Sequence, residues 1–456
     1  MRPTGRLHIG HYFGALQNWV RLQNAVIPGS EDRDSSSPLA THLSPLPAYD
    51  CFYFIADWHA LTSDYADTGG VAENTIEIVT DYLAAGLDPG RDNCTIFQQS
   101  LVPEHAELHL LLGMVTPLSW LERVPTYKEQ IENVTNKDLH TYGFLGYPCL
   151  QTADIVMYSS PGAPGEPGIP LFVPVGEDQV SHVELSREIV RKFNLHNFVL
   201  DAGGLASHPQ VADAYMVMRG SFDPTMQGFR QRGTPTLSEI YELQALVKKR
   251  VNEVGLQNYL EHLNSYKGLQ ENHIAFRTFL KEPLVEPQYM LTKTPRIPGL
   301  DGRKMSKSYG NAITLSESDD DIRKKTKVMV TDPARKRRTD PGNPEVCPVY
   351  DWHKLFSTPE TLAWAAEGCR TAGIGCIECK AKMADHLIEW ITPIRERRVK
   401  YEQHPAQVLE VIDEGSKKAR EVAKVTMERV REAVFGWQKK RNEIKTLSFE
   451  VHDTHA

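Results

Sequence analysis

Two short segments constrain what this chain can fold into more than any other feature. The first spans residues 3–11 and reads PTGRLHIGH, and the second spans residues 304–308 and reads KMSKS. Each segment places glycine or serine beside imidazole or ammonium groups. A nucleoside triphosphate site needs this combination, because small residues let backbone N–H groups approach phosphates while cations balance the charge. A chain that uses both segments must fold so that they meet.

The composition between these segments predicts an α/β fold. Residues 51–56, 95–97 and 171–175 each read as a short buried strand. The stretches between them have helical periodicity, and a β-α-β alternation implies a parallel sheet. The third strand ends at Gly176, and Asp178 opens the next helix. This junction is therefore expected at the carboxyl edge of the sheet, where open α/β folds bind ligands.

Further motifs occur at residues 54–62 (FIADWHALT), 147–155 (YPCLQTADI) and 174–179 (PVGEDQ). Together with the first two segments, which correspond to the HIGH and KMSKS motifs, they resemble class I aminoacyl-tRNA synthetases and, among these, the tryptophanyl-tRNA synthetases. The resemblance covers residues 2–26, 51–194 and 290–435. It implies a tryptophan--tRNA ligase, which activates L-tryptophan with ATP to tryptophanyl-AMP and pyrophosphate, then transfers the amino acid to the 3′ end of tRNA(Trp).

The resemblance also implies a domain organisation. The expected parts are a Rossmann-like, doubly wound catalytic domain (1–194, with an insertion at 27–49), an inserted substructure (195–289), a return to the catalytic domain (290–318), an all-helical C-terminal domain that binds the tRNA anticodon (319–435) and a tail (436–456). The family has a strand directly before its HIGH segment. Only Met1 and Arg2 precede Pro3 here, so the first strand of the sheet is expected to be missing.

Activation of an amino acid needs no general base, because the carboxylate is already a nucleophile; it needs positioning and charge stabilisation. The resemblance assigns transition-state stabilisation to His8, His11, Lys304 and Lys307. Mg²⁺ is expected to accompany ATP. The predicted ATP-binding set is Arg2, Pro3, Thr4, Gly10, His11, Gly176, Glu177, Asp178, Lys304, Met305, Ser306, Lys307 and Ser308. The alternatives are that the two histidines only cap a helix, that residues 304–308 form a solvated loop, and that Asp178 is only an N-cap.

Amino acid choice is expected to rest on a polar stripe along an otherwise apolar helix. Tyr147, Gln151 and Asp154 are spaced i, i+4 and i+7, so they share one helix face. A buried carboxylate that accepts the indole N–H would reject phenylalanine, which leaves it unpaired. The resemblance gives this role to Asp154, and Gln179 completes the tryptophan set. Asp154 paired with an internal arginine is the alternative reading, and tyrosyl-tRNA synthetases, which share the stripe, are the nearest rival family.

Four of the seven cysteines cluster late in the chain, at Cys347, Cys369, Cys376 and Cys379. Four thiolates form a tetrahedral sulfur site, and this chemistry leaves zinc, a [4Fe-4S] cluster and coincidental thiols open. A subfamily of tryptophanyl-tRNA synthetases has a similar spacing, which implies a [4Fe-4S] cluster. The odd cysteine number and the late grouping favour a reducing compartment.

Charge and hydropathy limit the partners. The net charge is −8, so contacts with RNA phosphates must come from local patches. Residues 335–338 (RKRR) are one candidate patch, Arg395, Arg397, Arg398 and Lys400 are another, and a solvated surface is the alternative for both.

The sequence predicts no membrane span and no secretory leader, hence a cytoplasmic location. The resemblance implies a homodimer. Other open readings are a coenzyme adenylyltransferase and a non-catalytic relative that binds RNA or senses redox state.

Overall fold

The computed structural model divides the chain into two compact units. Unit 1 comprises Met1–Leu101, Pro174–Asp178 and Leu291–Ala419, and unit 2 comprises Val102–Val173, Gln179–Met290 and Arg420–Ala456. The structure describes residues 1–27, 48–133, 138–161, 168–200, 218–219, 236–255, 258–259, 261–262, 280–292, 297–437, 440–441 and 444. Most of the expected insertion 27–49, of the substructure 195–289 and of the tail 436–456 lies outside these residues. The domain boundaries expected from the sequence stay predictions.

The α/β part of unit 1 is built on two parallel strands, β1 (Cys51–Ile55) and β2 (Cys94–Gln98). Cys51 pairs with Cys94, and the register runs to Ile55 opposite Gln98. Helix α3 (Asp57–Asp64) follows β1, and helix α4 (Val71–Ala85) makes the crossover to β2. Helix α4 ends at Gly86, whose φ of 114° is the left-handed helix stop that glycine adopts easily. The parallel pair and its crossover helix confirm the α/β class.

The start of the chain lies against the edge of β1. The terminal ammonium of Met1 donates to Phe54 O at 2.6 Å, and Ala56 N donates to Met1 O at 2.8 Å. The other described strands are paired as β3 (Leu171–Val175) with β6 (Pro287–Leu291) and β4 (Val199–Leu200) with β5 (Leu280–Lys281). Within the described residues the strands thus form three two-stranded ladders, where the sequence predicted one doubly wound sheet.

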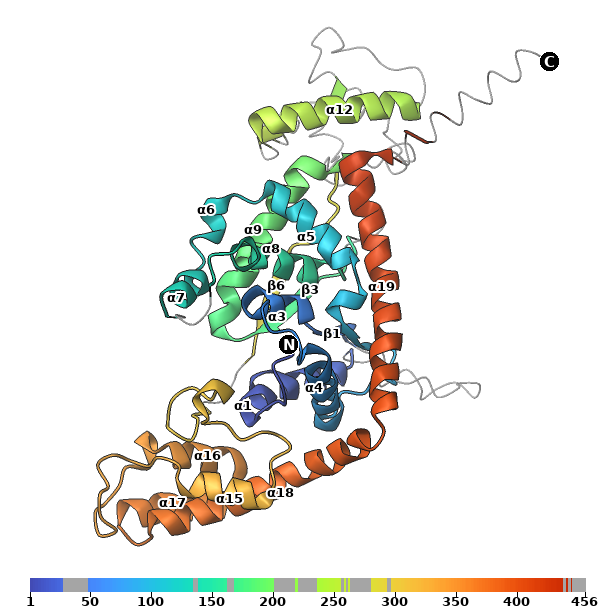
Figure 1. The fold of residues 1–456 in the computed structure, drawn as a ribbon. Helices are drawn as coiled ribbons and strands as arrows, with labels where there is room; N and C mark the ends of the chain where they lie inside the picture. The colour runs from blue at the N-terminus through green and yellow to red at the C-terminus, as the bar shows by residue number, and fades with distance from the viewer. Residues whose placement is uncertain are drawn as a thin grey trace, which may run out of the picture. The chain divides into compact units, whose positions relative to one another are not determined.

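The rest of unit 1 is helical, as expected for the C-terminal region (Figure 1). Helix α15 (Asp319–Lys327) is capped by Ser318, and helix α17 (Pro359–Arg370) is capped by Thr358. Helix α15 packs on the long helix α18 (Cys376–Glu402), α17 packs on α16 (Pro348–Phe356), and α18 also packs on α16 and α4. Trp352 is fully buried, and its indole N–H donates to Pro298 O. Helix α19 (Pro405–Phe435) begins in unit 1 and ends in unit 2.

The core of unit 2 is formed by three helices, α5 (Glu104–Val115), α8 (Tyr142–Val156) and α9 (Val180–Asn197). Thr141 caps α8 by accepting the N–H of Phe144. Shorter or more peripheral helices complete the unit: α6 (Leu118–Leu121), α7 (Pro125–Asn133) and α12 (Leu237–Val254). A search of the described helices finds none with the length and apolarity needed to cross a bilayer.

Candidate active site

The first phosphate segment forms a tight turn that leads into a helix. Gly5 has a φ of 98°, a conformation that side chains rarely adopt. His8 is the N-cap of the short helix α1 (Ile9–His11), and its backbone N–H is 3.2 Å from His11 Nδ1. Helix α1 continues through a π-helical turn (η1, Tyr12–Leu16) into α2 (Gln17–Gln23). The rings of the two histidines are close and tilted, with 3.7 Å between their centroids and 31° between their planes.

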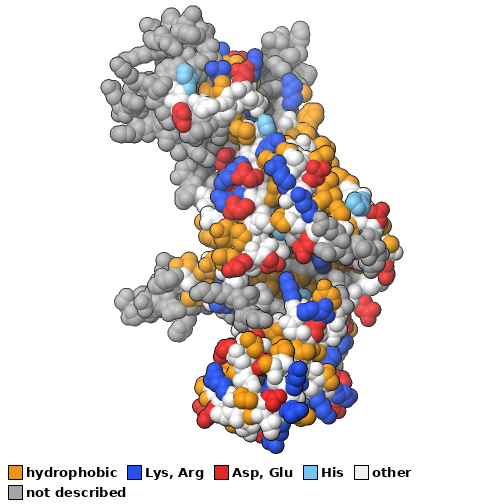
Figure 2. All heavy atoms as spheres, turned by 90° about the vertical axis from the view of Figure 1, so that its left-hand side faces the viewer, with side chains coloured by type: hydrophobic (Ala, Val, Ile, Leu, Met, Phe, Trp, Pro, Cys, Tyr) orange, Lys and Arg blue, Asp and Glu red, His pale blue; other side chains and the backbone are white. Residues whose placement is uncertain are grey.

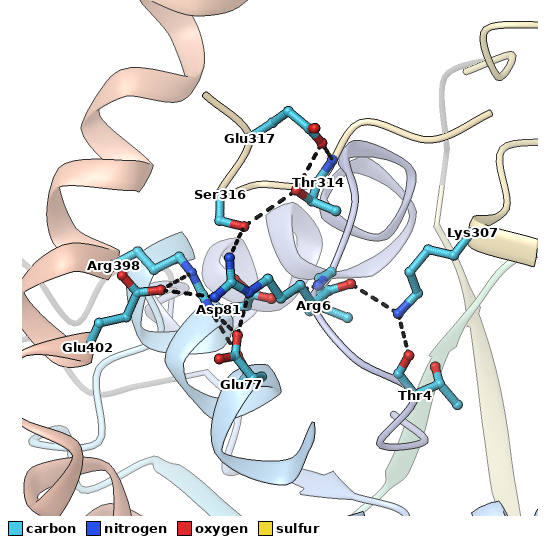
Figure 3. A network of polar contacts seen from close by, with 11 residues as sticks. Thr4, Arg6, Glu77, Asp81, Lys307, Thr314, Ser316, Glu317, Arg398 and Glu402 are labelled. Atoms are coloured by element: carbon cyan, nitrogen blue, oxygen red, sulfur yellow. Dashed lines mark hydrogen bonds and ion pairs between the residues drawn. The ribbon is translucent and has the colours of Figure 1, made fainter. Parts of the chain in front are cut away.

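The second segment lies directly against the first. Ile9 N donates to Ile313 O at 3.0 Å, and Leu315 N donates to Leu7 O at 2.9 Å. The Lys307 ammonium donates to two carbonyl oxygens of the first segment, Thr4 O at 2.7 Å and Arg6 O at 3.0 Å (Figure 3). Met305 also closes on this turn, because a Cβ added to Gly10 would be 3.5 Å from its sulfur. The structure therefore brings both phosphate segments together within unit 1.

The two imidazoles are neutral at pH 7. Burial, reinforced by the nearby Lys307 ammonium, lowers the pKa of His8 to about 4. Burial, with His8 and Lys307, lowers the pKa of His11 to about 3. The Nδ1 atom of His8 is buried and has no hydrogen-bond partner among the described residues. A buried nitrogen without a hydrogen-bond partner, close to the Lys307 ammonium, is typical of a site that binds an anionic ligand.

The remaining predicted ATP-binding residues differ in how they are held. Lys304 is almost fully exposed, and its ammonium is 4.0 Å from Asp178 Oδ2. Gly176 is tightly packed, since an added Cβ would be 2.9 Å from Asp178 Oδ1. Glu177 and Asp178 belong to the 3₁₀ turn η3 (Glu177–Gln179), and the N-cap of α9 is Gln179, so Asp178 is not the helix cap.

Four residues complete the predicted ATP-binding set: Arg2, Pro3, Ser306 and Ser308. Arg2 is exposed and Pro3 is buried. Ser306 N donates to Asn311 Oδ1 at 2.7 Å. Ser308 belongs to the 3₁₀ turn η6 (Lys307–Tyr309), and its side chain lies outside the described atoms.

The residues predicted to select tryptophan belong to unit 2. Tyr147 and Gln151 are half-buried on α8, and Tyr147 lies with its ring 5.8 Å from that of His182. Asp154 is buried, and its Oδ1 is 2.5 Å from Nδ1 of His105 on α5. The other nitrogen of His105 is 2.7 Å from the hydroxyl of Tyr158. One internal partner of Asp154 is therefore a histidine, His105.

The sequence did not identify His105 as a site residue. It is completely buried on an apolar helix, where a lone histidine carries no local signature. Only its contact with Asp154, 49 positions further along the chain, reveals the pairing. A buried hydrogen bond to a carboxylate is charge-assisted and fixes the orientation of the acceptor. The arrangement can therefore hold one carboxylate oxygen while the other is directed elsewhere.

The four late cysteines are neighbours in unit 1. Burial raises the pKa of Cys379 to about 12, and the other three thiols raise it further through their charge. Nη1 of Arg335 is 3.8 Å from Cys369 Sγ, and Nε2 of His353 is 3.4 Å from Cys379 Sγ. Gly342 leaves room for the sulfur, since a Cβ there would be 2.6 Å from Cys369 Sγ. No group of three or more potential ligands in the described part of the chain is spaced to hold a single metal ion.

Several residues of the two basic patches bind the protein itself. Arg335 is buried and donates to the carbonyls of Ile374 and Arg338, whereas residues 336–338 are exposed. In the second patch, Arg397 donates to Ala84 O at 2.7 Å, and Arg398 is buried against two carboxylates. Sequence composition could not distinguish these structural arginines from exposed ones.

Comparison with known proteins identifies the family. A family model described as tRNA synthetases class I (W and Y) matches residues 1–220 and 270–391. The tryptophan--tRNA ligase of Ralstonia nicotianae is 42% identical over 441 residues, covering 95% of this chain and 96% of that protein. The tryptophan--tRNA ligase of Thermotoga maritima is 40% identical over 435 residues, covering 95% and 97%.

A solved structure supports the fold. The tryptophanyl-tRNA synthetase of Campylobacter jejuni complexed with ADP and tryptophan has a TM-score of 0.62 and 24% identity, and the match covers 95% of this chain and 98% of that one. The class I synthetase fold is thereby confirmed. The two relatives at 42% and 40% identity are both named tryptophan--tRNA ligases, which favours the tryptophanyl over the tyrosyl branch. The chain belongs to the tryptophan--tRNA ligase family of class I tRNA synthetases.

Proposed function

We propose that this chain activates L-tryptophan with ATP, forming tryptophanyl-AMP and pyrophosphate, and transfers the tryptophan to the 3′ end of tRNA(Trp). The observation that supports this most is the junction of the two phosphate segments, where Lys307 Nζ is 2.7 Å from Thr4 O. The lysine side chain is flexible, so its ammonium can leave the carbonyls of Thr4 and Arg6 and move to the phosphates when ATP binds. The predicted domain division, with catalysis in 1–194 and 290–318 and anticodon binding in 319–435, is part of this proposal.

In the activation step, the tryptophan carboxylate attacks the α-phosphate and pyrophosphate leaves. His8 and His11, being neutral, act as hydrogen-bond donors to the phosphates, while Lys304 and Lys307 supply positive charge. Mg²⁺ bound by the phosphates would neutralise further negative charge. Gly176 and Asp178 are assigned to the ribose side of the nucleotide. No proton has to be removed by the protein, which is consistent with a site that has no general base.

For tryptophan, the proposed acceptor of the indole N–H is Asp154, with Tyr147, Gln151 and Gln179 as further contacts. His105 holds one carboxylate oxygen at 2.5 Å, so the other oxygen has a fixed direction. An amino acid without an N–H at that position would leave the buried carboxylate unsatisfied, which costs about 1–3 kcal/mol or more for a charged group. This difference would be the basis of discrimination against phenylalanine.

The experiment is tryptophan-dependent ATP–pyrophosphate exchange, with tyrosine and phenylalanine as competing substrates. Wild-type protein should exchange with tryptophan and far less with the other two. Lys307→Ala should lose most of the exchange, and Lys336→Ala, an exposed lysine outside the junction, is the matched control. A wild-type protein that exchanges with tyrosine better than with tryptophan, or with no amino acid at all, would refute the proposal.

We further propose a [4Fe-4S] cluster on Cys347, Cys369, Cys376 and Cys379. The donor set is four thiols close enough to influence one another electrostatically. Four thiolates are the ligand set of a [4Fe-4S] cluster, and zinc is the alternative occupant of the same four sulfurs. When bound, the cluster would crosslink the loop before α16, the end of α17 and the start of α18.

Anaerobically purified protein should be coloured and contain about four iron and four sulfide per chain. Cys347→Ser should reduce both contents, whereas Cys149→Ala, a core cysteine in unit 2, should not. Stoichiometric zinc in a colourless protein would overturn the assignment. The same preparations, compared after air oxidation, also show whether the cluster is stable in oxygen.

The region that carries α15 to α18 is proposed to contact the tRNA anticodon. Lys and Arg side chains are scattered over this region, at the bottom of Figure 2. Of the first basic run, only the exposed residues 336–338 remain candidates for phosphate contacts. Replacing all three with alanine should weaken tRNA binding and its salt dependence while leaving pyrophosphate exchange intact.

A homodimer is proposed from an exposed apolar patch in unit 2. Leu110, Met114, Leu118 and Tyr142 are between 54% and 74% exposed. Large exposed apolar side chains gathered on neighbouring helices are typical of subunit interfaces. Light scattering should give twice the chain mass of 51.4 kDa, and Met114→Glu should give monomer. The proposed location is the cytoplasm.

A further inference from the structure

A buried group of charges in unit 1 lies behind the first phosphate segment. Arg398 of α18 is 1% exposed, and Asp81 of α4 is completely buried. Nη1 of Arg398 is 2.5 Å from Asp81 Oδ1, and Nη2 contacts Glu77. Glu402 lies 3.1 Å from Nε on the next turn of the same helix. Figure 3 shows these side chains converging between the two helices.

Stability alone is a weak reason for such a pair. Removing two charges from water costs several kcal/mol for each ion, and buried pairs are often no more stabilising than apolar side chains of the same volume. Burial raises the pKa of Asp81 to about 6, although the Arg398 guanidinium lowers it. Arg398 therefore opposes protonation of this carboxylate, together with the Leu7 N–H and Arg6. The question is what an ionised carboxylate does at this position.

The other oxygen of Asp81 is bonded to the phosphate segment. Oδ2 accepts the backbone N–H of Leu7 at 2.6 Å. Leu7 directly precedes His8, and its own carbonyl accepts Leu315 N from the strand-like stretch after the second segment. The backbone of Leu7 is thus held on one side by Asp81 and on the other by the chain that carries Lys307.

A second contact acts on the adjacent residue. Nε of Arg6 is 2.8 Å from Glu77, and its Nη1 is 3.2 Å from Ser316 Oγ. The carbonyl of Arg6 is one of the two acceptors of the Lys307 ammonium. The charges on α4 and α18 therefore reach the lysine of the junction through Arg6 (Figure 3). They reach the histidines through the backbone of Leu7, which directly precedes His8.

We propose that Asp81 and Arg398 are positioning residues for amino acid activation: Arg398 keeps Asp81 ionised and oriented, and Asp81 fixes the Leu7 N–H so that His8 and Lys307 face the phosphates. The inference rests on the proposed ATP-dependent function of this site. Neither residue touches a substrate in it. Their contribution is to the rate of the step, because displacement of a phosphate-binding turn by about 1 Å can cost about a hundredfold in rate.

The test compares two double variants that differ in one hydrogen bond. Asp81→Asn with Arg398→Met removes both charges but leaves a carbonyl that can accept the Leu7 N–H. Asp81→Ala with Arg398→Met removes the acceptor as well. Neither variant leaves an unpaired buried charge, which is the usual reason for unfolding when one ion of a buried pair is removed. Arg395→Met is the matched control on α18, because Arg395 bonds to Asp319 and to Glu317 O instead of to residues 6–7.

The measurement is kcat and KM for tryptophan and for ATP in pyrophosphate exchange, well below the thermal midpoint of every variant. The alanine double variant should have a kcat at least tenfold below that of the asparagine double variant, with KM for tryptophan within twofold and the Arg395 variant near wild type. Equal kcat values for the two double variants, with an active wild type, would overturn the inference and leave a structural ion pair. A wild type with no tryptophan-dependent exchange would overturn the proposed function, and the inference with it.

Discussion

Replacing His105 with leucine would test whether the buried His105–Asp154 contact is part of amino acid selection. The substitution keeps an apolar volume on α5 and removes the nitrogen that lies 2.5 Å from Asp154 Oδ1. Both side chains are almost completely buried, at 0% and 2% exposure. The carboxylate would then be free to rotate or to take up a proton, and either change removes a fixed acceptor for the indole.

The magnitude follows from the kind of contact. A hydrogen bond to a charged group contributes about 1.5–3 kcal/mol, and about 1.4 kcal/mol is a factor of ten. We therefore expect kcat/KM for tryptophan to fall by roughly 10- to 150-fold. The value for phenylalanine should change much less, because phenylalanine has no N–H to bind. The prediction is therefore a fall in the ratio of kcat/KM for tryptophan to kcat/KM for phenylalanine, and not a loss of tryptophan activity alone.

The assay is pyrophosphate exchange with each amino acid, combined with thermal denaturation. His109→Leu is the matched control, since His109 is one turn further along α5 and lies near Gly146. His105→Asn should recover part of the tryptophan preference, because its amide can donate to Asp154. A leucine variant with a lower thermal midpoint but an unchanged tryptophan-to-phenylalanine ratio would show that the contact is only structural.

Three further outcomes are expected. Lys307→Ala should lower the exchange rate by at least a hundredfold and Lys304→Ala by less, because only Lys307 is held at the junction; equal losses would contradict this. The pKa values of His8 and His11 lie below the value near 6.5 of an unfolded chain. The unfolded chain therefore binds more protons, and the free energy of unfolding without ligand should be fully present above pH 6.5 and fall as the pH drops towards 4. Urea titrations of wild type and of a variant with both histidines changed to asparagine should show a flatter profile for the variant. Finally, treating the cluster-bearing protein with an iron chelator should lower its thermal midpoint, whereas the same treatment of Cys347→Ser should change nothing.

Local sequence patterns predicted the elements well. Strands were expected at residues 51–56 and 95–97, and they occur at Cys51–Ile55 and Cys94–Gln98. The C-terminal region 319–435 was expected to be all-helical, and its elements from α15 to α19 are helices. These elements have strong periodicity or β-branched and aromatic composition, and both are local properties. The meeting of the two phosphate segments was also expected, because the chemistry of each is incomplete without the other.

Contacts between distant charged residues could not be predicted in this way. Arg335 and Arg398 belong to runs of basic residues, and the usual location of such runs is the solvated surface. The structure buries both, one against carbonyls and a thiol and the other against carboxylates. Burial of an arginine depends on which acceptors the fold supplies, and no local pattern encodes that. His105 was missed for the same reason.

The two buried carboxylates have a common design, although they belong to different units. Asp154 has one oxygen bonded to His105, and Asp81 has one oxygen bonded to Arg398 and the other to a backbone N–H. In each case a second side chain, remote in sequence, fixes the direction of the carboxylate. A buried charge pair contributes little net stability, which argues against a purely stabilising role for these carboxylates. A carboxylate whose rotamer is fixed can present one acceptor oxygen in one direction, which argues for a positioning role. If this reasoning holds, apolar replacement of Asp81 together with Arg398 should change the free energy of unfolding by no more than about 3 kcal/mol, since a gain of about 1–4 kcal/mol from removing the pair is offset by about 1–3 kcal/mol for the orphaned Leu7 N–H. A large loss of exchange activity in such a stable variant could then be assigned to misplacement of the phosphate segment, and a large loss of stability would show instead that the pair holds α4 and α18 together.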